Sequence, residues 1–402
     1  MAATTSAIRV GMAGLGVAST QVLPAFNILK DVAKVTAAAD VRPEALVKFA
    51  EDFGGETFPS IEDLCKSPNV DVIFVSTPNH FHAEHVIMAA EHKKNVIVEK
   101  PMALTVTECQ SMVDAAKRNG VRLMQGHTKM AEAPVRLMGE IVRSGELGKL
   151  GMIHTWDYTD LIYRPRMPHE LVTDRGGGAV YLQAPHQVDI IRYVGGGMVR
   201  SVRGMIGDWV PSRPTDGAYT AYIEFEDGTP ATAVYNGYSH FDTSELHFWV
   251  GEGGTPRDPE TNFRARREIE QAEKDGNEEA LKSAMRYAGQ AEGAYSHFDR
   301  QTERKQPFFG ITIVSCEKGD IRQSPDGLWI YGDDGKREID LGHTERGRVA
   351  EITEMRDAIV EDRDVFPSGA WGMATLEVTV AIIESSRQRK ELYMAHQSPV
   401  RA

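Results

Sequence analysis

A lysine at the end of an apolar run is the first residue that could do chemistry. The run Asn95–Val98 is followed by Glu99, Lys100 and Pro101. Such a run predicts a buried strand, and a proline cannot continue the hydrogen-bond ladder of a sheet. Because proline also restricts the residue before it, the backbone of Lys100 would be held in an extended form. A lysine whose pKa is lowered from about 10.4 can exchange a proton with a hydroxyl group. The alternative is a surface lysine that ends a strand.

A histidine in a second motif is the other candidate for proton transfer. Residues 176–189 read GGGAVYLQAPHQVD, and the three glycines permit close backbone approach at the mouth of a helix. His186 could move the proton itself while Lys100 polarises the oxygen. Asp189 shares a helical face with His186 and could orient or cap rather than react. Gln183 and Gln187 could hold a substrate through neutral hydrogen bonds. The alternative is a core histidine satisfied by its neighbours.

A glycine turn near the amino terminus predicts the element that would hold a nucleotide. Residues 7–13 are apolar and lead into Gly14, Gly16 and Val17, where a helical pattern begins. Gly14 would make the tight turn and Gly16 would let the backbone approach a pyrophosphate. The start of the helix offers N–H groups and a partial positive charge to the same group. Ser19 stands at the third small position of this fingerprint.

An acidic residue after the next strand bears on the choice of cofactor. Residues 35–39 predict a second strand, and it ends at Asp40. A carboxylate there can bind the ribose 2′-hydroxyl and repel a 2′-phosphate, which favours NAD over NADP. Arg42 could partner a phosphate, so NADP stays possible. The alternative is a glycine turn with a solvated aspartate.

A third buried strand leads into a polar loop. Residues 71–76 read DVIFVS and run into Thr77, Pro78, Asn79 and His82. Proline and asparagine mark a loop at the carboxyl end of the strand. In an open parallel sheet the ligand crevice lies just outside these ends, so we expect this loop to contact the cofactor together with Glu99 and Lys100.

These motifs occur together in one known family. The glycine turn with Asp40, the TPNxxH loop at 77–82 and the EKP sequence at 99–101 follow the order and spacing of the Gfo/Idh/MocA oxidoreductases. The sequence resembles that family over nearly the whole chain, most strongly over 8–189. The resemblance implies that Lys100 lies beside the nicotinamide and the reacting hydroxyl. His186 matches the family histidine beside the lysine.

The sequence also departs from the family pattern. Many members have an aspartate four residues before the histidine, where this chain has Leu182. The usual set of lysine, aspartate and histidine is therefore incomplete, and a role carried by that aspartate is in doubt.

Further motifs resemble one branch of the family. The YRPR, GGG and QAPHQVD motifs and the segment 308–327 are similar to the branch that contains phthalate 4,5-cis-dihydrodiol dehydrogenase. Arg164 and Arg166 flank a proline and could clamp a substrate carboxylate, or could belong to a solvated loop. The resemblance implies hydride transfer between a secondary alcohol on a six-membered ring and nicotinamide, with a carboxylated cis-dihydrodiol as the best substrate. The alternatives are a sugar or inositol dehydrogenase, a lyase or glycosidase-like enzyme with retained NAD, and a non-catalytic NAD sensor.

The elements that must position these residues predict an α/β protein of two domains. We expect a Rossmann domain at 1–126 and a substrate-binding and oligomerisation domain at 127–402 with a mixed, mostly antiparallel open sheet. A charged, helix-prone insertion at about 257–293 could be a lid, an oligomer contact or a solvated excursion. A terminal helix at 371–386 is expected to pack back toward the first domain. The other expected strands include 121–124, 152–158, 219–225, 230–238, 245–250, 310–316 and 328–331, and the other helices 134–144 and 349–359.

Composition narrows the class and the partners. The chain has 402 residues, of which 41% are hydrophobic and 26% charged, as expected for a soluble globular protein. A net charge of −13 disfavours nucleic acid as a partner. No long apolar run or secretion signal is present, so we expect no membrane partner and a cytoplasmic location. We expect a small-molecule substrate and a homo-oligomer, either a dimer or a tetramer.

Cysteine and histidine spacing bears on disulfides and metals. Cys65, Cys109 and Cys316 lie far apart in the sequence and form no CxxC pair, so we expect reduced thiols. His82 and His85 do not have the spacing of a zinc-binding helix with a glutamate base, and no third ligand is evident. We therefore predict no metal site.

Overall fold

The computed structural model describes residues 7–126, 129–290 and 304–400. Residue 127, where the second domain is expected to begin, and residues 291–293 of the expected insertion lie outside the described residues. The chain divides into two compact units, and each takes three segments of the sequence. The first unit consists of Met1–His127, Ala280–Arg300 and Arg348–Met373. The second unit consists of Thr128–Glu279, Gln301–Gly347 and Ala374–Ala402.

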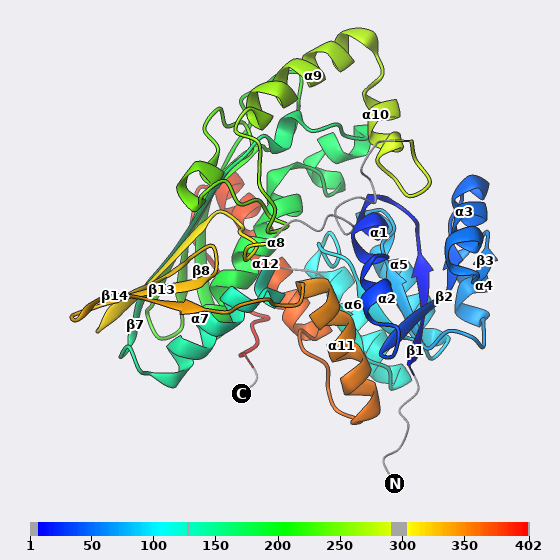
Figure 1. Ribbon diagram of the computed structural model, residues 1–402, viewed down its shortest axis with the longest axis horizontal. Coiled ribbons are helices and arrows are strands. Elements are labelled where there is room, and N and C mark those ends of the chain that lie inside the picture. The colour runs from blue at the N-terminus through cyan, green and yellow to red at the C-terminus, as the bar shows by residue number, and fades with distance from the viewer. Residues whose placement is uncertain (1–6, 127–128, 291–303, 401–402) are drawn as a thin grey trace. The chain divides into compact units, whose positions relative to one another are not determined.

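The first unit contains a six-stranded parallel sheet with helices (Figure 1). Its strand order reverses between β1 and β4, which is the switch point where open α/β sheets bind ligands. The predicted Rossmann fold is confirmed. In sheet order the strands are β3 (Glu56–Phe58), β2 (Ala33–Ala39), β1 (Ile8–Ala13), β4 (Val72–Val75), β5 (Asn95–Val98) and β6 (Leu123–Gln125). The helices are α1 (Val17–Val22), α2 (Ala25–Ile28), α3 (Pro43–Phe53), α4 (Ile61–Lys66), η1 (Asn79–Phe81), α5 (His82–Glu91) and α6 (Val106–Asn119).

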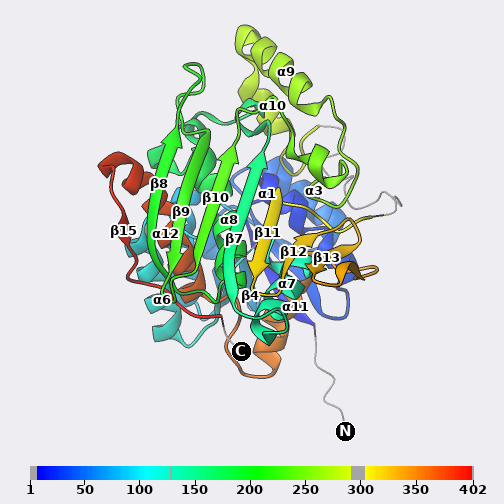
Figure 2. The ribbon, with the colours of Figure 1, turned by 90° about the vertical axis from the view of Figure 1, so that its left-hand side faces the viewer.

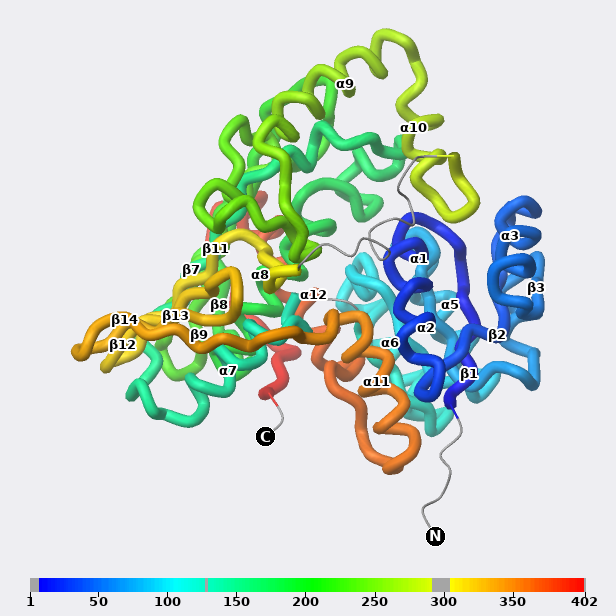
Figure 3. Tube along the Cα trace, viewed as in Figure 1, coloured from blue at the N-terminus to red at the C-terminus, as the bar shows by residue number. Residues whose placement is uncertain are grey.

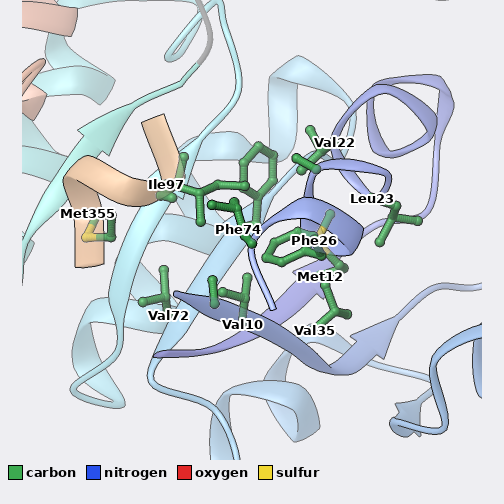
Figure 4. Packing of buried hydrophobic residues seen from close by; sticks show 14 of the residues in the cluster. Val10, Met12, Val22, Leu23, Phe26, Val35, Val72, Phe74, Ile97 and Met355 are labelled. Atoms are coloured by element: carbon green, nitrogen blue, oxygen red, sulfur yellow. The ribbon is translucent and has the colours of Figure 1, made fainter. Parts of the chain in front are cut away.

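Strands β4 and β5 are apolar and buried along almost all of their length because helices cover both faces of the sheet. Val10 and Phe74, on β1 and β4, are completely buried in one cluster with Phe26 of α2 (Figure 4). Met355 enters the same cluster from α11 (Gly347–Val360), which the tube in Figure 3 draws in orange. A late segment of the sequence thus completes the core of the amino-terminal sheet.

The second unit contains a nine-stranded sheet, shown from its uncovered face in Figure 2. Only the β7–β10 pair is parallel among the paired strands of this sheet, which confirms the expected mixed, mostly antiparallel sheet. In sheet order the strands are β14 (Gly335–Asp340), β13 (Gly327–Gly332), β12 (Gly319–Gln323), β11 (Ile311–Cys316), β7 (Leu150–Tyr158), β10 (Pro230–Asn236), β9 (Ala218–Phe225), β8 (Val199–Gly207) and β15 (Leu392–Tyr393).

Helix α8 (Gly178–Val194) packs on β7, β9 and β10 and carries the predicted histidine. Helix α12 (Gly369–Gln388) packs on β8, where Gly204 N donates to Ser385 Oγ at 2.9 Å. The remaining helices are η2 (Lys129–Ala131), α7 (Ala133–Ser144), η3 (Leu161–Tyr163), η4 (Pro168–Leu171), η5 (Thr173–Arg175), η6 (Thr243–His247), α9 (Thr261–Asp275) and α10 (Glu278–Ala284). Helices α9 and α10 lie in the predicted insertion.

The strand expected at 245–250 is wrong, because this segment forms the 3₁₀ helix η6. The side chain of Asp242 accepts a hydrogen bond from Ser244 N at 2.9 Å and so caps a turn. Phe248 and Trp249 have φ angles of 66° and 55°, which lie in the left-handed region and end any extended run. His247 stacks on Phe308 with ring centroids 4.5 Å apart, and this contact holds the turn in place.

No helix within residues 7–126, 129–290 and 304–400 combines the length and hydropathy needed to cross a membrane.

Candidate active site

The glycine turn after β1 is held by hydroxyl groups. Gly14 has a φ angle of 91°, and a side chain there would meet Ser76 O and Thr77 Cγ2 at 3.1 Å, so only glycine fits. Ser19 Oγ donates to Gly14 O at 2.7 Å, and Ser76 Oγ donates to the same oxygen at 2.9 Å. The turn is therefore fixed both by the end of the neighbouring strand β4 and by the helix that follows the turn.

Gly16 leaves room beside the start of α1. Gly16 is the N-cap of this helix, and no described side chain caps it. A Cβ built on Gly16 would meet only Ser76 O, at 3.8 Å, among the described atoms. The N–H groups that begin at Val17 thus face a region where glycine leaves room for a ligand. This arrangement suits the pyrophosphate of a dinucleotide.

Asp40 directly follows β2, and its side chain binds the glycine turn. Asp40 Oδ2 accepts a hydrogen bond from Leu15 N at 2.7 Å, while Oδ1 accepts from Arg42 N at 2.8 Å. Arg42 Nε lies 3.1 Å from Asp40 Oδ1 in an ion pair, and Arg42 Nη2 donates to Leu15 O at 2.6 Å. The two residues predicted to read the ribose therefore form one unit with the glycine turn.

The loop at 77–82 is tied to the segment that carries the lysine. His82 is almost completely buried, with Nε2 2.8 Å from Thr77 O and Nδ1 2.9 Å from Pro101 O. Burial lowers the pKa of His82, although the two carbonyl groups act to raise it. A neutral imidazole has one N–H and can donate to only one of them at a time. Pro78 is exposed and Asn79 half-buried, so these two have more access to a cofactor than His82.

A buried ion pair precedes the candidate lysine. Lys100 is half-buried just beyond β5, and its N–H donates to Glu99 Oε2 at 3.2 Å. Glu99 pairs with Arg348 of α11, whose Nη1 lies 3.5 Å from Glu351 Oε2. Burial raises the pKa of Glu351 to about 7, and Arg348 opposes this rise. Glu99 therefore serves to hold the backbone from which Lys100 projects.

In the second unit, a buried aspartate caps the helix that carries His186. Val180 N in the first turn of α8 donates to Asp216 Oδ2 at 2.7 Å, and Thr173 Oγ1 donates to Oδ1 at 2.6 Å. Burial raises the pKa of Asp216 to about 6, although both hydrogen bonds lower it. Asp216 lies far along the chain from this part of the helix, so nothing in the sequence near α8 indicates this cap.

His186 is buried on α8 against an aromatic ring. Its imidazole contacts Phe309 edge to face, with centroids 4.8 Å apart. Asp189 accepts a hydrogen bond from Thr375 Oγ1 at 2.6 Å and lies 3.9 Å from Arg192. These contacts connect Asp189 to α12, so it acts in holding the helix. Lys100 belongs to the first unit and His186 to the second.

The two predicted glutamines differ in their surroundings. Gln187 is completely buried: Tyr219 Oη donates to its Oε1 at 2.7 Å, and its Nε2 donates to Val234 O at 3.1 Å. Its amide therefore holds α8 on the sheet. Gln183 is also buried, but its Oε1 has no hydrogen-bond partner within the described parts of the chain. It is the glutamine that retains an acceptor for a ligand.

The two predicted arginines have internal partners. Arg164 Nη2 donates to Asp160 Oδ1 at 2.8 Å, and Arg166 Nη2 donates to Leu161 O at 3.0 Å. Burial acts to raise the pKa of Asp160, but Arg164 and a second arginine, Arg257, hold it below its ordinary value. The side chain of Arg164 is 33% exposed and that of Arg166 only 10%, so Arg164 has the better access to a substrate.

A buried acid on β7 was not found by sequence reasoning. Asp157 is paired in register with Tyr235 of β10, and its Cβ lies near Gly310 at the start of β11. Burial raises the pKa of Asp157 to about 8, helped by Glu252 and Asp242 and opposed by Arg164 and Arg257. The surroundings of Asp157 thus favour its protonated form. Its only sequence signal is one charge within an alternating strand.

Family models match both halves of the chain. The model described as "Oxidoreductase family, NAD-binding Rossmann fold" matches residues 8–127, and that of the GFO/IDH/MocA C-terminal domain matches 135–255. The chain is 35% identical, over 94% of its length and 95% of the relative's, to 1-carboxy-3-chloro-3,4-dihydroxycyclohexa-1,5-diene dehydrogenase of Comamonas testosteroni. It is 27% identical to 2,7-anhydro-N-acetylneuraminate hydratase of Escherichia coli, over 82% of this chain and 81% of that one.

A solved structure has the same fold over nearly the whole chain. A protein of Bordetella bronchiseptica RB50 is 37% identical and superposes with a TM-score of 0.89, covering 96% of this chain and all of the other.

Proposed function

Because this chain belongs to the Gfo/Idh/MocA oxidoreductase family, we propose that it oxidises a secondary alcohol on a six-membered ring and that its substrate is a carboxylated cis-dihydrodiol. The support for the substrate is the relative from Comamonas testosteroni, whose name describes a carboxylated ring diol and which is similar over almost all of both chains. The observation that carries the reaction type is the glycine turn with Asp40 at the switch point of the sheet.

We propose that NAD binds along the carboxyl ends of β1, β4 and β5. The glycine turn would receive the pyrophosphate at the start of α1, and Asp40 the ribose 2′-hydroxyl. Bound NAD supplies the hydride acceptor. NADP is the alternative cofactor, because Arg42 could bind its 2′-phosphate. The affinities of the protein for NAD and for NADP decide between the two. The residues proposed to surround the cofactor are Gly14, Gly16, Val17, Asp40, Arg42, Thr77, Pro78, Asn79, His82, Glu99 and Lys100.

The chain's own chemical task is to move one proton. Lys100 is proposed to accept the proton of the reacting hydroxyl group, and His186 is the second candidate for this role. If His186 takes the proton, the amine of Lys100 polarises the oxygen. The buried ion pair of Glu99 with Arg348 supports this assignment, because it holds the backbone of Lys100.

The polar groups of the second unit suit a diol that carries a carboxylate. Gln183 retains an acceptor that a hydroxyl group of the substrate would satisfy. Arg164 is proposed to bind the substrate carboxylate, because part of its guanidinium side chain is exposed. Arg166 and Gln187 were predicted as substrate ligands, and their contacts support a role in positioning the site.

A substrate panel tests this proposal. The panel holds cis-dihydrodiols with and without a ring carboxylate, inositols and pyranosides, each with NAD or NADP, and formation of reduced nicotinamide is followed by absorbance. We expect the fastest reduction with NAD and a carboxylated dihydrodiol. If NAD is reduced with sugars or inositols but not with any dihydrodiol, the dihydrodiol is excluded as the substrate. That result would favour a sugar or inositol dehydrogenase.

A cofactor-retaining lyase or hydratase is a second candidate, favoured by the similarity to the hydratase of Escherichia coli. Such an enzyme converts its substrate without net formation of reduced nicotinamide. Product analysis by mass spectrometry in the same assays separates the two: turnover with no change in absorbance supports this candidate.

The proposal includes a cytoplasmic homo-oligomer, either a dimer or a tetramer. The cysteines Cys65, Cys109 and Cys316 are not in disulfides, which is the state expected in a reducing compartment. The face of the second sheet opposite α8 is uncovered in Figure 2, and Met205 and Tyr222 on β8 and β9 are exposed. Exposed apolar side chains on a sheet are suited to contact with a second copy. Sedimentation velocity measures the oligomeric state.

A further inference from the structure

A tyrosine from late in the sequence is buried in the nucleotide-binding unit. Tyr287 follows α10 and is completely buried in the same apolar cluster as Phe49 of α3, with Leu46 and Phe53 packed against that cluster. Its hydroxyl donates to Asp52 Oδ2 at 2.7 Å, near the end of α3. The aromatic ring and the hydroxyl therefore anchor this segment against the helix that begins directly after Arg42.

The backbone carbonyl of Tyr287 contacts Arg42, the arginine that is proposed to lie beside the cofactor. Arg42 Nη1 donates to Tyr287 O at 3.2 Å. Arg42 Nε donates to Asp40 Oδ1 at 3.1 Å, and Nη2 donates to Leu15 O at 2.6 Å. Each of the three guanidinium nitrogens thus has an acceptor. Leu15 O belongs to the glycine turn, Asp40 follows β2, and Tyr287 O lies in the segment after α10. The guanidinium is held against the turn rather than left to rotate.

This arrangement affects the two cofactors in opposite ways. A ribose 2′-hydroxyl needs a carboxylate acceptor, whereas a 2′-phosphate needs cationic donors. While Arg42 is held, its donors are satisfied within the protein and Asp40 keeps a fixed position. We propose that Tyr287 is a positioning residue that holds Arg42 in its pair with Asp40 and thereby makes the nucleotide site prefer NAD to NADP. This inference rests on the proposed placement of the adenosine ribose beside Asp40.

The opposite changes in affinity separate this role from a purely structural one. Loss of the anchor releases Arg42 toward a 2′-phosphate and loosens Asp40, so binding of NADP improves while binding of NAD weakens. General loosening of the unit would weaken both cofactors together. The ratio of the two affinities is therefore the informative quantity.

The test compares three variants of the full-length protein. Tyr287→Ala removes the anchor, Tyr287→Phe keeps the ring and loses the bond to Asp52, and Lys48→Ala breaks the Lys48–Asp52 ion pair on the same helix without touching Tyr287. Dissociation constants for NADH and NADPH are measured by fluorescence titration, and kcat/KM is measured for both oxidised cofactors. For Tyr287→Ala we expect the NADPH to NADH affinity ratio to rise about tenfold, as for loss of one charge-assisted hydrogen bond. Tyr287→Phe should give a smaller rise in the same direction, and Lys48→Ala none.

Other outcomes overturn the inference. Equal weakening of both cofactors by Tyr287→Ala, or an unchanged ratio, would show that the tyrosine has no effect on selectivity. If Tyr287→Ala fails to fold, Asp52→Ala removes the acceptor of the tyrosine hydroxyl together with the ion pair to Lys48, and Lys48→Ala controls for the loss of that ion pair. A ratio in Asp52→Ala no higher than in Lys48→Ala is equally decisive.

Asp40→Ala, measured in parallel, tests the placement of the ribose separately. If the NADPH to NADH affinity ratio rises in Asp40→Ala but not in Tyr287→Ala, the role of Tyr287 is rejected and the placement of the ribose stands. An unchanged ratio in Asp40→Ala rejects the ribose placement and this inference with it.

Discussion

Arg348 of α11 forms a buried ion pair with Glu99, the residue directly before the candidate lysine. Both side chains are more than nine-tenths buried, and Glu351 lies on the other side of the guanidinium. A late helix of the chain therefore stabilises the strand end on which the proposed chemistry takes place. Removal of the cation would leave carboxylates facing one another without a counter-charge.

The first prediction concerns this pair. Arg348→Met should lower the free energy of unfolding by about 3–5 kcal/mol, the cost of a buried charge without its partner. The control is Arg356→Met, which breaks a more exposed ion pair with Asp357 on the same helix and should cost less than about 1 kcal/mol. Urea unfolding measures both variants, and equal losses would show that the Glu99 pair has no special role.

The second prediction concerns Lys100. Lys100→Met should reduce kcat by orders of magnitude, because the proton acceptor is lost, and should leave the dissociation constant for NADH nearly unchanged. The control is Lys94→Met at the other end of β5, whose amine donates to Ser67 O and Val70 O and is remote from the strand's carboxyl end. An active Lys100→Met enzyme would refute the role of this lysine.

The third prediction follows from the raised pKa of Asp157. The folded pKa is about 8, whereas an aspartate in an unfolded chain titrates near 3.9. Between these pH values the folded protein binds a proton that the unfolded chain has released, so the stability contributed by this group falls as the pH rises toward 8. Asp157→Asn cannot ionise, so it does not lose this stability. The difference in melting temperature between Asp157→Asn and the parent protein should therefore increase in favour of the variant as the pH is raised from 5 to 9.

The matched control for this experiment is Asp227→Asn, which changes an exposed aspartate in the turn between β9 and β10. Its melting temperature should follow that of the parent protein at every pH. A constant difference between Asp157→Asn and the parent across the range would contradict the raised pKa.

The fourth prediction uses the two glutamines of α8 as a pair. Gln187→Leu leaves the Tyr219 hydroxyl and the Val234 carbonyl without their partner and should destabilise the fold by about 1–3 kcal/mol for each group. Gln183→Leu should cost little stability and raise KM for the diol about tenfold, the value of one hydrogen bond to substrate. Stability loss in Gln183→Leu with an unchanged KM would argue against its substrate role.

Local pattern was enough to predict the architecture. The apolar run before Gly14 and the run from Asn95 to Val98 became β1 and β5, because a strand buried on both faces is apolar along its length. The glycine turn, Asp40 and the loop at 77–82 were placed at one edge of the sheet because each follows a strand directly. Motif and element there are adjacent in sequence, so short-range reasoning sufficed.

Local pattern failed where a distant residue decided the outcome. Residues 245–250 alternate as a strand would, yet they form a 3₁₀ helix in which His247 stacks on the distant Phe308, while the cap from Asp242 is a local signal. Nothing near Gln187 in the sequence indicated that Tyr219 and the backbone of β10 would take up its amide.

The sequence by itself determined the fold class, the family and the identity of the residues that could move a proton or hold a nucleotide, because residue type, periodicity and spacing are local properties. Only the tertiary structure decided which of those side chains already have partners. The pairing of Glu99 with Arg348, the contact of Arg42 with Tyr287 and the raised pKa of Asp157 all depend on burial and on groups brought together from distant parts of the chain. These energies arise from distances in space, which sequence spacing does not contain.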